Sequence, residues 1–140
     1  MSTLEPKPEL YRGLTYPWGR GANPTPGEPH RIADGVYWAR FAMPMSLDHI
    51  NLWLLQDEDG WTVVDTCLNL PDARATWEQL FIGFMQGKPV RRVICTHLHP
   101  DHVGLAGWLT ERFDCEANSI DSSSVMARTA LFSASTDVSS

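Results

Sequence analysis

The sequence of 140 residues has no long apolar stretch and no excess of positive charge. No apolar run approaches the roughly 18 residues of a membrane-spanning helix, and the N-terminus lacks the apolar core of about 7 to 15 residues of a signal peptide. Lys and Arg number 11 against 17 Asp and Glu, so no basic surface for nucleic-acid phosphates is indicated. We therefore expect a cytoplasmic protein that binds a small-molecule substrate and neither membrane nor nucleic acid.

Cysteine is also scarce, which excludes two ways of stabilising a small fold. Cys67, Cys95 and Cys115 are an odd number without CxxC spacing, so neither a disulfide framework nor a thiolate zinc site is indicated. Apolar residues, in contrast, make up 43% of the chain and include six Trp and five Phe. This content is sufficient for one domain with a packed core.

Proline and glycine are concentrated at the N-terminus, where six of the ten prolines lie in residues 1–30. Proline interrupts helices and central strands, so residues 1–30 are expected to form an extended arm, with regular structure beginning after Asp34-Gly35. The domain is expected over residues 31–133. A serine-rich tail over 134–140 is expected to be frayed.

Hydrophobic periodicity predicts an order of strands and helices within this domain. Apolar residues at helical spacing between Pro71 and Gly87 indicate an amphipathic helix. Strands are expected at 36–43, 47–56, 61–65, 90–96 and 115–120, and helices at 73–85, 103–113 and 122–132. This order predicts an α/β domain in which a mixed sheet carries helices on one face.

The segment ICTHLHPDHVGLAGWL, residues 94–109, holds three of the five histidines within six positions. His97 and His99, two residues apart on an extended backbone, project to the same side. Pro100 favours an extended His99 and a helix start, so Asp101 and His102 emerge toward the same volume. Imidazole and carboxylate groups are ligands that zinc prefers, and the pattern therefore predicts a metal site. Gly104 allows the backbone to approach this site closely.

Each of these residue types also has an ordinary structural role. Asp101 alone is a favoured helix N-cap, and an isolated histidine carries little information. His49 could line the site, although a structural role is favoured. His30, in the arm, is a weaker candidate for the site than His49. The combination H-x-H-x-D-H, rather than any single residue, favours the metal site.

The motif THLHPDHVG resembles the signature of the metallo-beta-lactamase superfamily. The resemblance extends upstream through a strand pair, VVDT at a strand end, a helix and the strand before the motif, roughly residues 30–113. It implies an αββα sandwich of two similar halves, of which this chain would supply the N-terminal half. Members of the superfamily include glyoxalase II-like thioesterases, lactonases, beta-lactamases, sulfur dioxygenases and RNA-processing nucleases.

This resemblance also implies roles for particular residues. His97 and His99 would bind a first metal, and Asp101 and His102 a second, the ions being zinc or iron. Asp65 would support a ligand by a hydrogen bond. Asp101 would also act in catalysis by orienting the water, and a metal-bound hydroxide would be the nucleophile. Cys67, where many relatives have glycine, would be a packed residue and not a ligand.

The superfamily pattern requires more ligands than the chain provides. A further histidine for each metal and a bridging aspartate are needed, and no histidine follows His102. We expect a metal-dependent hydrolase of an ester-like compound, such as a thioester or lactone. The alternatives are a truncated, inactive chain or interaction module with a partial metal site, and a metal-dependent nuclease, which the acidic composition disfavours.

Overall fold

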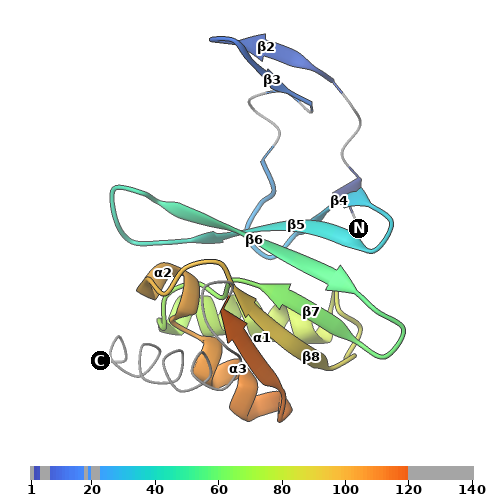
Figure 1. Cartoon of the computed structure of the whole chain (residues 1–140), viewed down its shortest axis with the longest axis vertical. Coiled ribbons are helices and arrows are strands. Elements are labelled where there is room, and N and C mark those ends of the chain that lie inside the picture. The colour runs from blue at the N-terminus through green and yellow to red at the C-terminus, as the bar shows by residue number, and fades with distance from the viewer. Residues whose placement is uncertain (1, 4–6, 18, 20–22, 120–140) are drawn as a thin grey trace.

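A mixed seven-stranded sheet dominates the computed structural model, which describes residues 2–3, 7–17, 19 and 23–119 (Figure 1). The strand order is β1-β4-β5-β6-β7-β8-β9. β4 to β7 pair antiparallel, whereas β7, β8 and β9 run parallel. The strands are β1 (Ser2–Thr3), β4 (His30–Ala33), β5 (Val36–Ala42), β6 (His49–Gln56), β7 (Trp61–Val64), β8 (Val90–Cys95) and β9 (Glu116–Ser119).

Alternation along the two long strands decides which face of the sheet is buried. In β5 every second side chain from Tyr37 to Phe41 is buried, and β6 buries Ile50, Leu52 and Leu54. A period of two places such residues on one face of a pleated strand. The predicted strands and the β6–β7 hairpin, which pairs Gln56 with Trp61, are confirmed.

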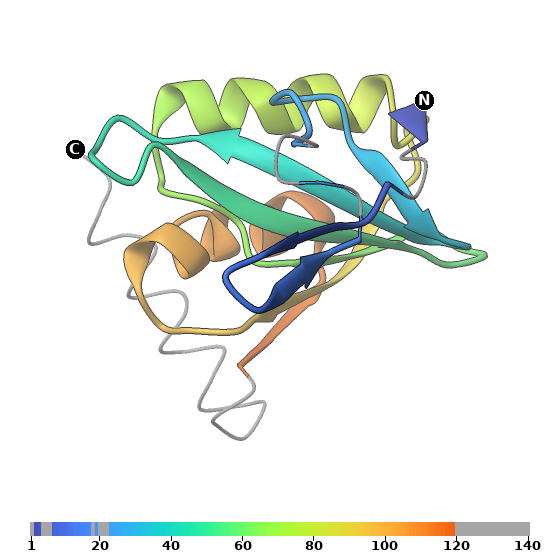
Figure 2. The same ribbon diagram turned by 90° about the horizontal axis from the view of Figure 1, so that it is seen from above.

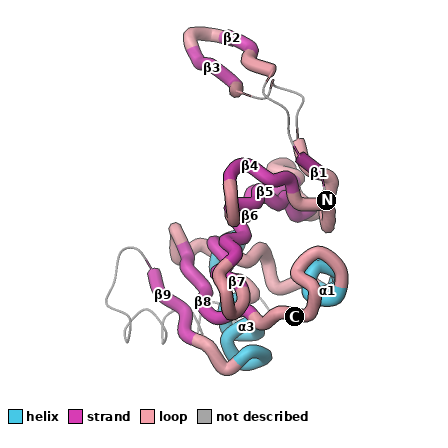
Figure 3. The backbone as a smooth tube through the Cα atoms, turned by 90° about the vertical axis from the view of Figure 1, so that its right-hand side faces the viewer, coloured by secondary structure: helices cyan, strands magenta, loops and turns pink. Residues whose placement is uncertain are grey.

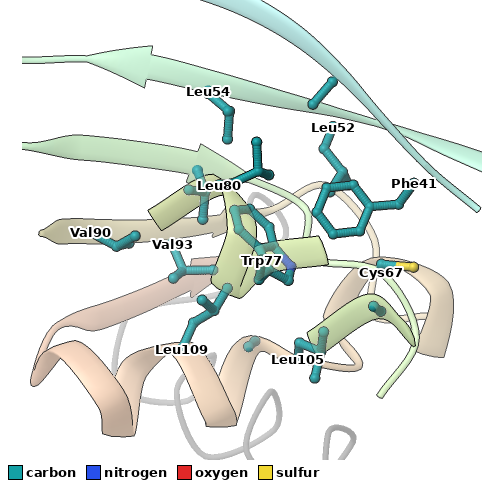
Figure 4. Packing of buried hydrophobic residues seen from close by; sticks show 14 of the residues in the cluster. Phe41, Leu52, Leu54, Cys67, Trp77, Leu80, Val90, Val93, Leu105 and Leu109 are labelled. Carbon is teal, nitrogen blue, oxygen red and sulfur yellow. The ribbon is translucent and has the colours of Figure 1, made fainter. Parts of the chain in front are cut away.

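The helices cover that buried face, as predicted. They are α1 (Pro71–Ile82), α2 (Pro100–Val103) and α3 (Ala106–Phe113). Trp77 of α1 lies beside Phe41 of β5, with ring centroids 4.9 Å apart (Figure 4). Phe81 of α1 contacts Trp108 and Phe113 of α3, so the two helices also pack on each other. Over the described part of the chain, no helix has the length and apolar character to cross a membrane.

The single helix predicted through residues 103–113 was wrong, because the chain forms two helices that are separated at Gly104 and Leu105. The backbone N–H of Leu105 donates to Oγ1 of Thr66 at 3.0 Å. A Cβ at Gly104 would lie 2.6 Å from the carbonyl oxygen of Cys67. The loop after β7 therefore packs directly on the break, and a tertiary hydrogen bond replaces the one a continuous helix would make.

The prediction that residues 1–30 lack regular structure was also wrong. β1 pairs with β4, and β2 (Glu9–Tyr11) and β3 (Leu14–Tyr16) form a hairpin that stands away from the sheet (Figure 3). Arg12 and Gly13 both have positive φ, which suits a two-residue hairpin turn. Prolines flank this hairpin and do not interrupt it. The predicted helix at 122–132 and the tail at 134–140 lie outside the described residues.

Candidate metal centre

The histidine motif lies where two parallel strands end at the same edge of the sheet. β7 and β8 pair with Val64 opposite Ile94, so Asp65 and Thr96, which follow these strands, are brought together. The chain then turns through His97 and His99 into α2, which carries Asp101 and His102 (Figure 1). Sheet pairing therefore joins Asp65 to a motif more than thirty residues away in the sequence.

Asp65 is the buried acceptor at the centre of this edge, with 4% of its surface exposed. Its Oδ1 accepts from the backbone N–H of Thr96 at 2.8 Å. Its Oδ2 accepts from Thr96 Oγ1 at 2.7 Å and from Nδ1 of His102 at 2.9 Å. The aspartate adopts a positive φ of 65°, a conformation that non-glycine residues rarely adopt.

These hydrogen bonds determine which ring nitrogen of His97 and of His102 is available to bind a metal. Since a carboxylate only accepts, the proton between Asp65 and His102 belongs to Nδ1 of His102. The one hydrogen of the Thr96 hydroxyl points to Asp65, so Thr96 Oγ1 accepts from Nδ1 of His97, 3.0 Å away. When such a ring is neutral its lone pair is on Nε2, and a carboxylate partner such as Asp65 is typical of metal-bound histidine.

The motif residues lie near one another but do not converge fully. The rings of His97 and His102 are 4.7 Å apart between centroids, and those of His97 and His99 are 6.0 Å apart. Nε2 of His102 lies 3.5 Å from Oδ2 of Asp101. Two ligands about 2.1 Å from a tetrahedral ion are separated by roughly 3.4 Å, so this pair has the spacing of two zinc ligands.

Donor chemistry therefore fits a metal, but the described residues do not form a complete site. Within the described ranges, no group of three or more His, Cys, Asp or Glu side chains is arranged to hold a metal ion. His97 and His99 are exposed. The assignments of His97, His99, Asp101 and His102 as ligands, of Asp101 in catalysis and of Asp65 as their support stay predictions.

Two threonines hold the motif in place, and sequence reasoning assigned no role to either. Thr96 connects Asp65 to His97, and Thr66 donates from Oγ1 to the carbonyl oxygen of His102 at 2.8 Å. The signal available in the sequence was position, because Thr66 directly follows Asp65 and Thr96 directly precedes His97. Their importance depends on hydrogen bonds across the sheet edge, which the sequence pattern does not show.

Other residues considered as candidates have local roles. Cys67 is packed, as expected, with 1% of its surface exposed, and burial raises the pKa of its thiol to about 11. His49 begins β6 and pairs through Nδ1 with Oδ1 of Asp48 at 2.8 Å, which lowers the pKa of that carboxyl. His30 begins β4. The N-cap of α2 is His99, so Asp101 does not take the capping role that its residue type suggests.

Comparison with known proteins decides the family. The sequence family model of the Metallo-beta-lactamase superfamily matches residues 45–122, which is more than half of the chain. The chain belongs to this superfamily. The match includes Asp65, the whole histidine motif and the sheet from β6 to β9, which confirms the resemblance seen in the sequence.

Solved structures in this superfamily share the fold. A beta-lactamase domain protein from Burkholderia ambifaria is 45% identical with a TM-score of 0.66, over 70% of this chain and 33% of its own. A metallo-beta-lactamase family protein from Thermus thermophilus is 32% identical with a TM-score of 0.51, over 58% of this chain and 27% of its own. The chain thus spans about a third or less of these structures.

A curated relative carries a more specific name. A linear primary-alkylsulfatase from a Pseudomonas species is 29% identical over 89 residues, which are 64% of this chain and 12% of that protein. The superfamily is of hydrolase type and its members typically bind metal ions, and this chain shares part of its fold.

Proposed function

We propose that the protein acts as the metal-carrying half of a hydrolase for an ester-like small molecule, such as a thioester, a lactone or a related acyl compound. The hydrogen-bond arrangement around Asp65 is the observation that carries this proposal, because it orients two histidines of the motif through their Nδ1 atoms. The alkylsulfatase relative supports the ester-like class, since an alkyl sulfate is a sulfate ester. A cytoplasmic location and the lack of nucleic-acid and membrane partners belong to the same proposal.

The chain's own residues would prepare the site. His97 and His99 would hold a first metal ion and Asp101 and His102 a second, by default zinc and with iron as the other candidate. A metal bound there supplies a Lewis acid and lowers the pKa of water toward about 7. Asp65 and Thr96 hold the Nδ1 atoms of His102 and His97, so the Nε2 lone pair of each neutral ring would be the one that binds a metal. Asp101, at the start of α2, would orient the attacking water.

An inactive role for this chain by itself is the second candidate. Two observations support it. The described residues provide no complete group of ligands, and the chain spans only a third or less of each compared structure. In that case the chain would bind metal weakly, because zinc in catalytic sites takes three protein ligands. Ligands beyond those described would then complete the site.

Metal content and turnover distinguish these candidates. The purified full chain is dialysed against zinc or iron, metal is measured by mass spectrometry, and hydrolysis of chromogenic thioester, lactone and alkyl sulfate compounds is followed. His97→Ala and His102→Ala should lower metal content and any turnover, whereas His30→Gln, a histidine outside the motif, should leave both unchanged. Binding without turnover supports the inactive candidate, and cleavage of labelled RNA instead of esters supports a nuclease.

A further inference from the structure

The turn after β7 holds two non-glycine residues in a left-handed backbone conformation. Asp65 has a φ of 65° and Cys67 a φ of 79°, and only Thr66 separates them. Residues other than glycine rarely adopt such values, which persist where the surrounding contacts over-determine them. The contacts that hold this turn therefore decide where Asp65 directs its carboxylate.

Thr66 fixes this turn to α2 through both its backbone and its side chain. Its backbone N–H and its Oγ1 each donate to the carbonyl oxygen of His102, both at 2.8 Å. That carbonyl belongs to the last turn of α2, where helix geometry leaves carbonyl groups without an intrahelical donor. Thr66 Oγ1 also accepts from the backbone N–H of Leu105. Asp65 thus holds the imidazole of His102 while Thr66 holds its backbone, so two consecutive residues fix one motif histidine.

A buried tryptophan of α1 supports Thr66 from the side of the hydrophobic core. The indole N–H of Trp77 donates to the carbonyl oxygen of Thr66 at 2.9 Å, and both residues are 0% exposed. α1 lies alongside β5 (Figure 2), where Trp77 packs on Phe41 with ring centroids 4.9 Å apart. Trp77 also stacks on Phe81 of its own helix, at 5.8 Å. Because a buried carbonyl without a donor is costly, the position of the turn depends on the position of this indole.

We propose that Trp77 is a positioning residue of the metal centre, which acts through Thr66 to fix the place of His102 and thereby the affinity for zinc. The inference rests on the proposed function, in which His102 binds a metal ion. Hydrogen bonds connect the Trp77 indole to the Thr66 carbonyl, and Thr66 to the His102 carbonyl. Groups that orient a metal ligand strongly affect metal affinity. Packing of α1 on β5 is thereby coupled to the ligand geometry at the edge of the sheet.

Trp77→Phe tests this role, because it removes the indole N–H and keeps an aromatic ring in the core. Trp61→Phe is the matched control: the Trp61 indole, in a residue 2% exposed at the other end of β7, donates to the carbonyl oxygen of Met85 at 3.2 Å. Zinc affinity of the full chain is measured by competition with a chelator. Loss of a direct partner of a ligand lowers affinity by about 10- to 100-fold. Trp77 acts one link further away, so we expect a loss of about 5- to 20-fold, and less than about twofold for the control. An equal loss in both variants overturns the proposal.

Two variants of Thr66 test the link between Trp77 and His102. Thr66→Val keeps the shape of the side chain without its hydroxyl and should lower zinc affinity by about tenfold or more. Thr66→Ser retains the hydroxyl and should lower it by less than about threefold. Trp77→Phe combined with Thr66→Val should lower the affinity by less than the product of the two separate factors, because both changes release the same turn. Factors that multiply fully, or wild-type affinity in Thr66→Val, would show that Trp77 does not act through Thr66.

Amide hydrogen exchange of the metal-free chain distinguishes a failure of this role from a failure of the metal function. Trp77→Phe should raise the exchange rates of the Thr66 and Leu105 N–H groups by about tenfold relative to the amides of β6, because both groups bind within the released turn. Trp61→Phe should leave these ratios unchanged. If His102→Ala keeps wild-type zinc affinity while the exchange rates respond as expected, Trp77 still positions the turn and the proposed metal function fails. Unchanged exchange of both groups in Trp77→Phe refutes the positioning role, whatever the zinc affinity.

Discussion

Asp65→Asn is the substitution that tests the hydrogen-bond arrangement most directly. Asparagine has nearly the same shape and tolerates positive φ better than most residues, so the backbone at φ 65° is not disturbed. One oxygen can still accept from the backbone N–H of Thr96. The other is replaced by an amide NH2, which faces two donors, the Thr96 hydroxyl and Nδ1–H of His102.

The expected losses follow from these contacts. Hydrogen bonds to a charged group are each worth about 1.5 to 3 kcal/mol, and two are removed. Thr96 can rotate its hydroxyl and His102 can move its proton to Nε2, which recovers part of the energy. We therefore expect the free energy of unfolding to fall by about 2 to 3 kcal/mol. Once Nε2 of His102 carries the proton, zinc affinity should fall by about 10- to 100-fold.

Three measurements check this reasoning. Urea unfolding gives the stability, calorimetry against a zinc chelator gives the affinity, and long-range proton–nitrogen NMR spectra report the His102 tautomer without metal. Thr96→Ser keeps the hydroxyl and is the matched control, for which we expect small changes only. Wild-type zinc affinity together with an unchanged Nδ1–H tautomer in Asp65→Asn would show that Asp65 does not orient His102.

Three further predictions concern stability. Gly104→Ala should lower the free energy of unfolding in urea by more than about 2 kcal/mol, because its Cβ would meet backbone oxygens of Cys67 and Pro100 at 2.6 Å. Gly13→Ala is the control: nothing lies within 4 Å of its Cβ, so any loss of stability should be confined to the β2–β3 hairpin. Burial raises the pKa of Cys67 to about 11 and of Cys95 to about 12. As pH rises, these thiols therefore lose their protons in the unfolded chain before they do so in the folded one. The free energy of unfolding should fall above about pH 9, by up to about 1.4 kcal/mol per pH unit for each thiol. Replacing both cysteines by alanine should remove that slope, and an equal slope in this variant would contradict the assignment. Arg112→Ala should cost about 1 to 2 kcal/mol in thermal unfolding, because its guanidinium lies over Phe81, Trp108 and Phe113, whereas Glu78→Gln, which removes only its half-exposed ion-pair partner, should cost less than about 1 kcal/mol.

Local patterns predicted the strands, the first helix and the motif, because each depends on residues close together in the sequence. Alternation in β5 and β6 and helical spacing in α1 follow from backbone geometry alone. The same reasoning failed at residues 104–105 and in the N-terminal arm. At residues 104–105 the helix is interrupted because the N–H of Leu105 donates to the hydroxyl of Thr66, in a distant loop. In the arm, a two-residue turn joins β2 and β3 into a hairpin between prolines.

The sequence by itself determined the superfamily, the identity of the donor groups and the mixed α/β order of elements. The tertiary structure alone decided that Asp65 and Thr96 meet, and that these two residues hold the Nδ1 atoms of His102 and His97. The physical reason is that a motif records spacing along the chain. Hydrogen bonds between strand ends, and the choice of which apolar side chains stay exposed, depend on sheet register, which brings distant residues into contact.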